Sequence, residues 1–168
     1  MSTGMHKAQA PKSVKVAVLT ASTTRSLADD KSGCWIKKHA EKKGHSVVFH
    51  RVVPDDREII ADTVHNIIEK HAPHAILVTG GTGVAPSDVT IETIRPLFTK
   101  ELTAFGFLFT LLSYEQIDSA ALLSRATAGI VGKTVVFCIP GSLQACKLAC
   151  KELIFPELGH LAKHLREG

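Results

Sequence analysis

Aromatic residues and long apolar runs are scarce in this sequence. Only 5% of its 168 residues are Phe, Trp or Tyr, including one Trp and one Tyr. No segment approaches the roughly 20 consecutive apolar residues that a membrane-spanning helix needs, and residues 1–13 lack the apolar block of a signal peptide. We therefore expect no membrane association, a flexible tail over residues 1–13 and a single domain over residues 14–168.

A dense basic stripe is also absent. The net charge is only +4, and the lysine cluster of Lys37, Lys38, Lys42 and Lys43 surrounds Glu41 at helical spacing. Such a cluster is typical of a solvated helix face, whereas nucleic-acid binders usually combine a basic stripe with aromatic side chains. The composition therefore argues against a nucleic-acid partner and is compatible with a small anionic ligand.

Cysteine usage is modest and unlike that of secreted domains. The four cysteines are Cys34, Cys138, Cys146 and Cys150. Cys138 lies in an apolar run and no signal peptide precedes it, which predicts reduced, buried thiols and a cytoplasmic protein. Cys146 and Cys150 are one helical turn apart, as are His160 and His164, but neither pair has a second pair at zinc-site spacing. We therefore expect no structural zinc.

Short apolar runs alternate with longer segments of helical periodicity. This alternation predicts a layered α/β fold with a mainly parallel sheet. The expected strands are residues 14–20, 47–53, 75–79, 125–130 and 134–139. The expected helices cover residues 32–43, a segment opened by residues 54–56, a region broken at Pro96 that includes Glu101, and a C-terminal region interrupted at Pro156, with a loop at residues 113–123.

Three of the expected strands are followed by Gly or Ser and then by a helix, at residues 20–33, 78–88 and 139–142. The carboxyl ends of parallel strands share one edge of a sheet, where ligands bind, and helix N-termini attract anions. The cluster Gly80-Gly-Thr-Gly83 lets the backbone approach a phosphate closely, although it is neither a P-loop nor a Rossmann fingerprint. The sequence thus predicts a phosphate-like ligand at this edge.

Two aspartates, Asp55 and Asp88, follow expected strands and can face the same edge. Carboxylates beside phosphates are the ligands that Mg²⁺ uses in phosphoryl and nucleotidyl transfer. Helix capping explains both residues equally well, since Asp55 with Glu58 fits a capping box and Asp88 can cap a helix after Pro86. The residues alone leave both interpretations open.

Other polar and aromatic residues carry weaker signals. Arg125, after Ser124, suits either a bidentate phosphate contact or a surface salt bridge. Glu101 suits a solvated helix face. Trp35 and Tyr114 are able to stack on an aromatic ligand, although a helix at Trp35 would bury its ring.

Several motifs together resemble the signature of the MoaB/MogA family of molybdopterin adenylyltransferases, which the molybdopterin-binding domains of gephyrin-like proteins share. These motifs are Ala28-Asp-Asp-Lys-Ser-Gly33, Val53-Pro-Asp55, Thr79-Gly-Gly-Thr-Gly83, Asp88-Val-Thr90, Leu123-Ser-Arg125 and Pro140-Gly-Ser142. Phe105-Gly106 and the stretch Leu112 to Glu115 favour the MoaB branch. The resemblance extends from Val14 to the C-terminal helix.

The resemblance implies a three-layer α/β/α domain with a mostly parallel sheet, assembled as a homotrimer or homohexamer. The implied activity is Mg²⁺-dependent transfer of AMP from ATP to the terminal phosphate of molybdopterin, with release of pyrophosphate. A possible later partner is the enzyme that inserts molybdate. Two alternatives remain open, a carrier that binds molybdopterin without chemistry and a trimeric scaffold for partner proteins.

Residue by residue, Asp55 and Asp88 resemble the two catalytic aspartates of the family and are the candidate Mg²⁺ ligands. The candidate substrate- or nucleotide-binding residues are Ser32, Gly33, Gly80, Gly81, Thr82, Gly83, Glu101, Ser124, Arg125, Pro140, Gly141 and Ser142. The chain departs from the family at Thr23, where Asp or Asn is common, and at Ala104 and Phe107, which replace Gly and Glu. The first departure casts doubt on a metal role for the first loop, and Phe107 is expected to alter pterin contacts or subunit packing.

Overall fold

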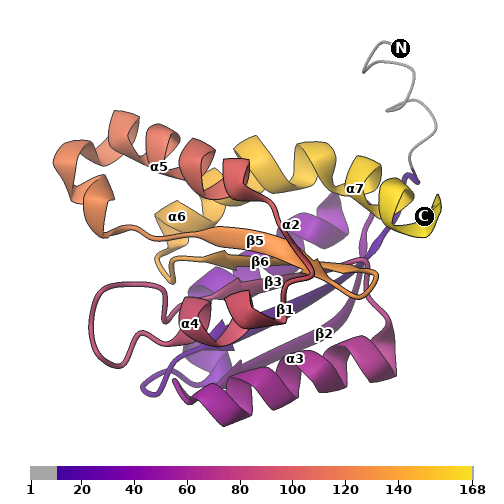
Figure 1. Ribbon diagram of the computed structural model, residues 1–168, viewed down its shortest axis with the longest axis horizontal. Helices are drawn as coiled ribbons and strands as arrows, with labels where there is room; N and C mark the ends of the chain where they lie inside the picture. Colours follow the sequence, from indigo (N-terminus) through magenta and orange to yellow (C-terminus); the bar gives the residue numbers. More distant parts are fainter. Residues whose placement is uncertain (1–10, 168) are drawn as a thin grey trace.

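The computed structural model describes residues 11–167 and contains a six-stranded sheet in the order β2-β1-β3-β6-β5-β4 (Figure 1). Strands β2, β1, β3 and β6 are parallel, whereas β5 pairs antiparallel with β6 and with β4. The strands are β1 (Lys15–Ala21), β2 (Ser46–Val53), β3 (Ala75–Thr79), β4 (Lys100–Glu101), β5 (Thr127–Val131) and β6 (Thr134–Ile139). The mostly parallel sheet predicted from the sequence is confirmed.

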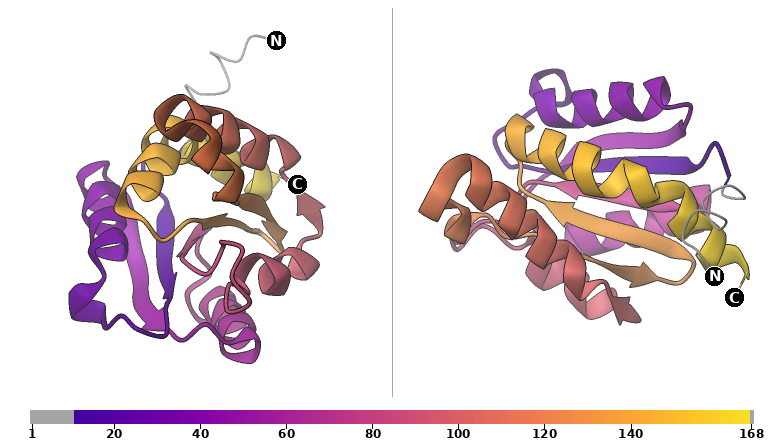
Figure 2. Two further views of the ribbon diagram at one scale, coloured as in Figure 1. Left: turned by 90° about the vertical axis from the view of Figure 1, so that its left-hand side faces the viewer. Right: turned by 90° about the horizontal axis from the view of Figure 1, so that it is seen from above.

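Helices cover both faces of the sheet, which gives three layers (Figure 2). Helices α2, α5, α6 and α7 bury one face and helices α3 and α4 bury the other. The helices are α2 (Lys31–Lys42), α3 (Arg57–His71), α4 (Thr90–Ile94), α5 (Thr103–Ile117), α6 (Leu143–Leu148) and α7 (Phe155–Glu167). A π-helical segment, Ala149–Ile154, joins α6 to α7, and 3-10 turns occupy Leu27–Asp29, Arg95–Leu97 and Asp118–Leu123.

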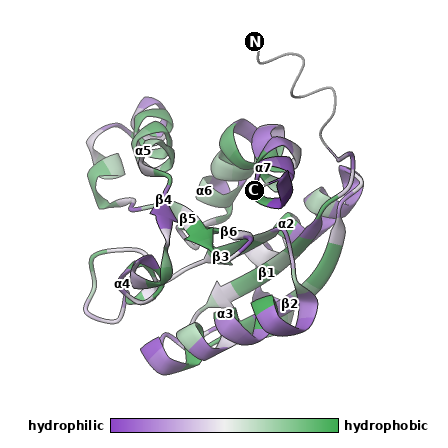
Figure 3. Cartoon of the chain, turned by 45° about the vertical axis from the view of Figure 1, so that its right-hand side comes forward, coloured by the Kyte–Doolittle hydropathy of each residue, from purple (hydrophilic) through white to green (hydrophobic). Residues whose placement is uncertain are grey.

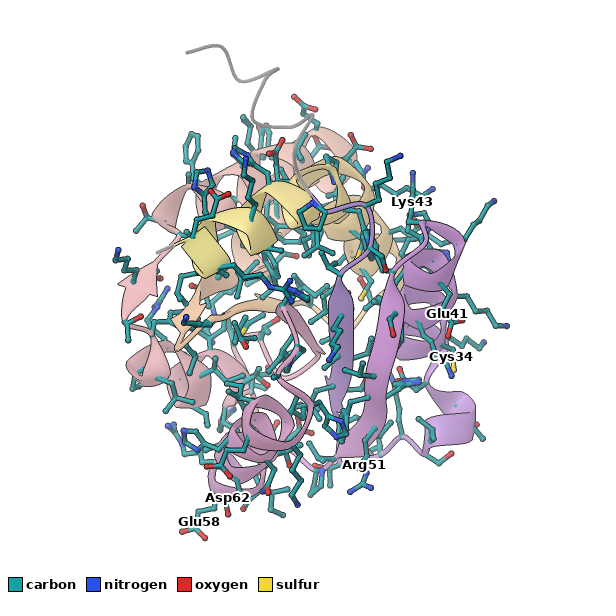
Figure 4. All side chains as sticks on the ribbon, turned by 90° about the vertical axis from the view of Figure 1, so that its right-hand side faces the viewer. Cys34, Glu41, Lys43, Arg51, Glu58 and Asp62 are labelled. Carbon is teal, nitrogen blue, oxygen red and sulfur yellow. The ribbon has the colours of Figure 1, made fainter. Side chains whose placement is uncertain are left out.

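The burial pattern of the strands reflects this layering. Every residue of β3 and β6 is buried, because both strands lie between two helical layers. Strand β2 is instead an edge strand of mostly partly exposed residues. Figure 4 looks onto this edge, with Cys34, Glu41 and Lys43 of α2 on one side of β2 and Glu58 and Asp62 of α3 on the other.

Val14 is the first buried residue of the part of the chain that the structure describes. Val14 is 1% exposed and belongs to the core, directly before β1. Of the tail predicted over residues 1–13, residues 1–10 lie outside the part that the structure describes, and Lys12 and Ser13 are exposed. Within residues 11–167, no helix has the length and apolar content needed to cross a membrane.

Two local predictions are wrong. Glu101 lies on the short edge strand β4, because the helical region ends at Leu97. Residues 113–123 are the end of helix α5 and a 3-10 turn, not a loop. Pro156 lies at the second residue of α7, directly after the π-helical segment Ala149–Ile154, so the C-terminal helical region changes from π- to α-helix beside this proline.

Candidate functional site

The three strand–helix junctions meet at the carboxyl edge of the sheet around a cavity of about 380 Å³. The loop after β1, the glycine loop after β3 and the turn after β6 all contribute to its wall, together with the end of the 3-10 turn before β5. The lining residues are Ala21, Ser22, Thr24, Arg25, Asp55, Gly80, Gly81, Thr82, Gly83, Asp88, Leu123, Ser124, Pro140, Gly141 and Ser142. Eight of the twelve predicted binding residues and both aspartates line this one cavity, whereas Ser32, Gly33, Glu101 and Arg125 do not.

The glycine loop has a backbone that only glycine accommodates. Gly80 and Gly81 have φ values of +91° and +63°, in the left-handed region. A Cβ at Gly80 would overlap the carbonyl oxygen of Ala21, and one at Gly81 would overlap the hydroxyl of Thr90. The loop is thus pressed against β1 and α4, and its own backbone forms the cavity floor.

Asp55 faces this floor and does not cap a helix. Its Oδ2 accepts hydrogen bonds from the backbone N–H of Thr23 at 2.8 Å and from the Thr23 hydroxyl at 2.9 Å. The N-cap of α3 is instead Asp56, whose carboxylate accepts from the N–H of Ile59. The capping-box interpretation of Asp55 is therefore wrong, and Thr23, a departure from the family pattern, serves to orient this carboxylate.

Asp88 also lacks a capping role. Its Oδ2 accepts from the N–H of Ala85 at 2.9 Å, which closes a tight turn within the loop. Helix α4 has Val89 at its N-cap, without a side-chain cap. The helix-capping alternative for Asp88 is wrong as well, so both carboxylates are held by loop contacts against the same cavity.

Arg25 is the one cationic side chain among residues 11–167 that lines the cavity, and the sequence analysis does not single it out. Its Nη1 donates to the carbonyl of Gly141 at 3.2 Å, which ties the loop after β1 to the turn after β6. The available signal was its place in the first of the three junctions, Ser22-Thr-Thr-Arg25. A guanidinium beside two carboxylates and a glycine loop is suited to a phosphate-bearing ligand.

Arg125 supports the glycine loop from behind instead of facing the cavity. Its Nε donates to the carbonyls of Thr82 at 2.9 Å and Gly83 at 3.1 Å. Its Nη1 pairs with Glu92 at 2.7 Å, and this hydrogen bond raises the pKa of Arg125 and lowers that of Glu92. Both alternatives for Arg125 are thus partly right, because it forms a salt bridge and also positions the predicted phosphate loop.

Glu101 does not reach the cavity. Its carboxylate accepts from Arg95 at 3.0 Å and from the hydroxyl of Thr127 at 2.9 Å, which fastens β4 to the neighbouring chain segments. The structure therefore gives Glu101 a structural position, away from the residues that surround Asp55 and Asp88.

Ser32 and Gly33 lie behind the turn after β6. Ser32 is buried and donates to the carbonyl of Gly141 at 2.8 Å, beside the contact from Arg25. Gly33 packs against the fully buried carboxylate of Asp30, which is the N-cap of α2. Ser32 thus acts on the cavity through Gly141, not by lining it.

Asp30 fixes the start of α2 relative to two strands. It accepts from the N–H of Gly33 at 2.9 Å, the hydroxyl of Thr20 at 2.7 Å and the ring of His50 at 3.1 Å. Burial acts to raise the pKa of Asp30, but the hydrogen bonds from His50, Thr20 and Gly33 outweigh it and hold the pKa below its ordinary value. Asp30 is therefore ionised at neutral pH and anchors the wall of the cavity.

None of the thiols lines this cavity, although Cys146 lies behind its wall and donates to the carbonyl of Pro140 at 3.3 Å. All four cysteines are free, and Cys138, Cys146 and Cys150 are buried. Burial raises the pKa of Cys146 and Cys150, so both stay protonated. Among residues 11–167, no group of three His, Cys, Asp or Glu side chains is placed to hold a metal ion by itself.

Taken together, the fold and the cavity define an α/β protein with a cavity suited to a phosphorylated ligand at the carboxyl edge of a mostly parallel sheet. The model of the probable molybdopterin binding domain matches residues 17–160. The chain belongs to this family of molybdenum cofactor biosynthesis proteins, in its MoaB branch.

The relatives match along nearly their whole length. Molybdenum cofactor biosynthesis protein B of Bacillus subtilis is 45% identical over 168 residues, covering 99% of each chain. A probable molybdopterin adenylyltransferase of Methanocaldococcus jannaschii is 40% identical, covering 94% of this chain and 97% of its own. A crystal structure of molybdenum cofactor biosynthesis protein B superposes with a TM-score of 0.91 at 42% identity, covering 95% of this chain and all of that one.

Proposed function

We propose that this protein transfers AMP from ATP to the terminal phosphate of molybdopterin and releases pyrophosphate. The main support is that Asp55 and Asp88 line one cavity with the glycine loop while neither caps a helix. Each carboxylate is held at the cavity by a loop contact through its Oδ2. The naming of the archaeal relative as a probable molybdopterin adenylyltransferase agrees with this proposal.

The residues fit a Mg²⁺ ion that is bound together with substrate. Mg²⁺ is usually held by one or two carboxylates, with phosphates and water completing its shell. Asp55 and Asp88 supply two carboxylates, and neither forms a salt bridge within residues 11–167. Bound there, Mg²⁺ would neutralise phosphate charge.

The protein groups would orient two phosphates for in-line attack. A terminal oxygen of the pterin phosphate forms a bond to the α-phosphorus of ATP, and the bond from that phosphorus to the bridging oxygen breaks as pyrophosphate leaves with the electron pair. The attacking phosphate is anionic at neutral pH, so no general base is needed. Arg25 and the N–H groups of Gly81, Thr82 and Gly83 would stabilise the charge that develops, whereas the N–H of Gly80 donates to the carbonyl of Ile139.

Pyrophosphate release from ATP, with and without molybdopterin, tests this function. We expect molybdopterin-dependent release by the wild type and a loss of at least about 100-fold in Asp55→Asn and in Asp88→Asn, since each removes a charged ligand of the transition state. Asp62→Asn is the matched control, because Asp62 is exposed on α3 away from the cavity (Figure 4). Tight molybdopterin binding without pyrophosphate release would make the protein a carrier, and unchanged rates in both variants would refute the carboxylate roles.

We also propose that the protein is a cytoplasmic homotrimer or homohexamer, able to pass its product to a molybdate-inserting enzyme. Helix α5 supports self-association, because its outer face is apolar, with Phe107 69% and Tyr114 57% exposed (Figure 3). Leu111 and Leu122 extend this exposed face. Light scattering should give a trimer or hexamer mass that Phe107→Lys lowers, and a monomeric wild type would exclude the assembly.

A further inference from the structure

A second cavity, of about 310 Å³, lies between the C-terminal half of α2 and the start of α7. Its lining residues are His39, Lys43, Lys151, Phe155 and Pro156. None of them lines the cavity at the glycine loop. A helix rises about 1.5 Å per residue, so Lys43 lies roughly 16 Å along the axis of α2 from Ser32. Ser32 is at the end of the helix that is near the glycine loop.

Aromatic rings form one wall of this second cavity. The ring of Trp35 stacks on His39 with centroids 4.6 Å apart and an interplanar angle of 15°. His39 also meets Phe155 at 5.3 Å, and His45 stacks on the same Phe155 at 5.6 Å. The ammonium of Lys151 lies 5.9 Å from the centre of the Trp35 ring. The wall is therefore a fixed apolar surface beside a cation.

The cations at this cavity lack counter-charges. Lys43 and Lys151 are exposed, and within residues 11–167 neither forms a salt bridge, although Glu41 and Glu152 are close in sequence. Lysines on a helix are usually solvated individually. Here, however, lysines from two separate elements border one concavity.

The neighbouring histidines are favoured in their neutral form by burial and by the charge of the lysines. Burial lowers the pKa of His39, and the charges of Lys43, Lys151 and Lys42 lower it further. The Nε2 of His39 and the Nδ1 of His45 are buried without a hydrogen-bond partner in the described part of the chain. The lysines therefore disfavour protonation of His39. Among residues 11–167, no acidic side chain lines this cavity to offset their charge.

We propose that this cavity is a second anion-binding site, which takes a small phosphate-bearing compound between Lys43 and Lys151. The two ammonium groups would bind the phosphate, and Phe155 and Pro156 provide an apolar surface for any ring attached to it. This site does not depend on the chemistry proposed for the glycine loop.

The single tryptophan of the chain is a built-in reporter for this site. Trp35 is the only Trp in the sequence, so fluorescence excited at the tryptophan band arises from this one ring, which lies beside the proposed site. Titration with inorganic pyrophosphate should change Trp35 fluorescence along a saturating curve, at constant ionic strength set with sodium chloride. AMP should bind as well, whereas adenosine, which lacks the phosphate, should not.

Paired lysine variants decide whether the response comes from this cavity. Lys43→Gln combined with Lys151→Gln should weaken the binding of pyrophosphate by at least about tenfold, because both charge-assisted contacts are lost. The control Lys100→Gln with Lys133→Gln removes the same charge from exposed positions elsewhere and should bind like the wild type. Circular dichroism melts should show that both double variants are folded.

Trp35 is only one turn from Ser32, so the glycine-loop site must be separated from this response. Arg25→Gln removes the cation of that cavity and should leave the Trp35 titration unchanged. A response that is linear with salt, that survives the Lys43 and Lys151 substitutions, or that disappears in Arg25→Gln would overturn the second site.

Discussion

The two cavities toward the ends of helix α2 are built in opposite ways. At the glycine loop, the charged groups are held by protein contacts, such as Asp55 by Thr23 and Arg25 by Gly141. At the far cavity, Lys43 and Lys151 form no salt bridge within residues 11–167. The first arrangement is preorganised for chemistry, where small displacements are costly, whereas the second offers charge without fixed geometry and suits reversible binding.

Gly80→Ala should have the largest effect on the glycine-loop cavity. A methyl group there would overlap the carbonyl of Ala21, in addition to the strain of a φ value of +91°. We expect a loss of about 2–4 kcal/mol in the free energy of unfolding and the disappearance of adenylylation. Chemical denaturation and pyrophosphate release measure the two effects.

Gly44→Ala is the matched control for that substitution. Gly44 has a nearly equal φ of +85°, but a Cβ would meet no atom within 4 Å. This variant should lose only about 1–2 kcal/mol, from backbone strain, and keep its activity. If the two alanine variants lost the same stability and the same activity, the close packing of the glycine loop against β1 would be irrelevant to the site.

Arg25→Gln should have the next largest effect. We expect the KM for ATP to rise by about 10- to 100-fold, because a charge-assisted hydrogen bond contributes about 1.5–3 kcal/mol, and Arg25→Lys should recover part of the loss. Arg51→Gln, on the exposed edge strand β2 (Figure 4), should behave like the wild type. Steady-state kinetics with varied ATP test this, and an unchanged KM in Arg25→Gln would remove Arg25 from the phosphate site.

Arg125→Met should have a smaller effect, since Arg125 acts through the loop. Loss of its hydrogen bonds to Thr82 and Gly83 should lower kcat/KM by about tenfold, in line with about 1 kcal/mol for a hydrogen bond. Arg95→Gln breaks a similar pair with Glu101 outside the cavity and serves as the control. Hydrogen exchange should show faster exchange around the loop in Arg125→Met only, and equal behaviour of the two variants would contradict a positioning role.

The sequence predicted the backbone of the site better than its side chains. Junctions and glycines are local signals, so the edge that carries Gly80 and Pro140 was predicted from residue order alone. Adjacent residues such as Asp55 and Asp56 have the same chemistry, however, and only the path of the chain decides that Asp56 caps α3 while Asp55 faces the cavity. Arg25 was missed for the same reason, because its contact with Gly141 joins residues that are 116 positions apart.

The prediction for the end of helix α5 is wrong because the exposed face of this helix is apolar. Its outer face carries Phe107, Leu111 and Tyr114, while Phe105 and Phe109 are buried on its inner face. A helix that is apolar on both faces lacks the periodicity that identifies an amphipathic helix. The sequence therefore predicts a loop from Ser113 onward, although α5 continues to Ile117.

Lowering the pH should have the smallest effect on stability. It should also distinguish His39 and His45, near the C-terminal end of α2, from Asp30 at its N-terminal end. Burial lowers the pKa of His39, His45 and His74, so the folded protein binds fewer protons than the unfolded chain just below pH 6.5. Stability should therefore decrease as the pH falls from about 7 toward 5, where unfolded histidines take up protons that the folded ones do not. Asp30, whose pKa is lowered, loses its contribution only at more acidic pH, below the ordinary range of a carboxyl group.

Thermal melts at stepped pH should show a Tm that falls by a few degrees between pH 7 and 5. His45→Phe, which retains an aromatic ring against Phe155, should reduce that fall. A Tm that is constant between pH 7 and 5 would mean that these histidines do not stay neutral in the folded protein, and the uncompensated positive charge inferred around Lys43 would then lack this support.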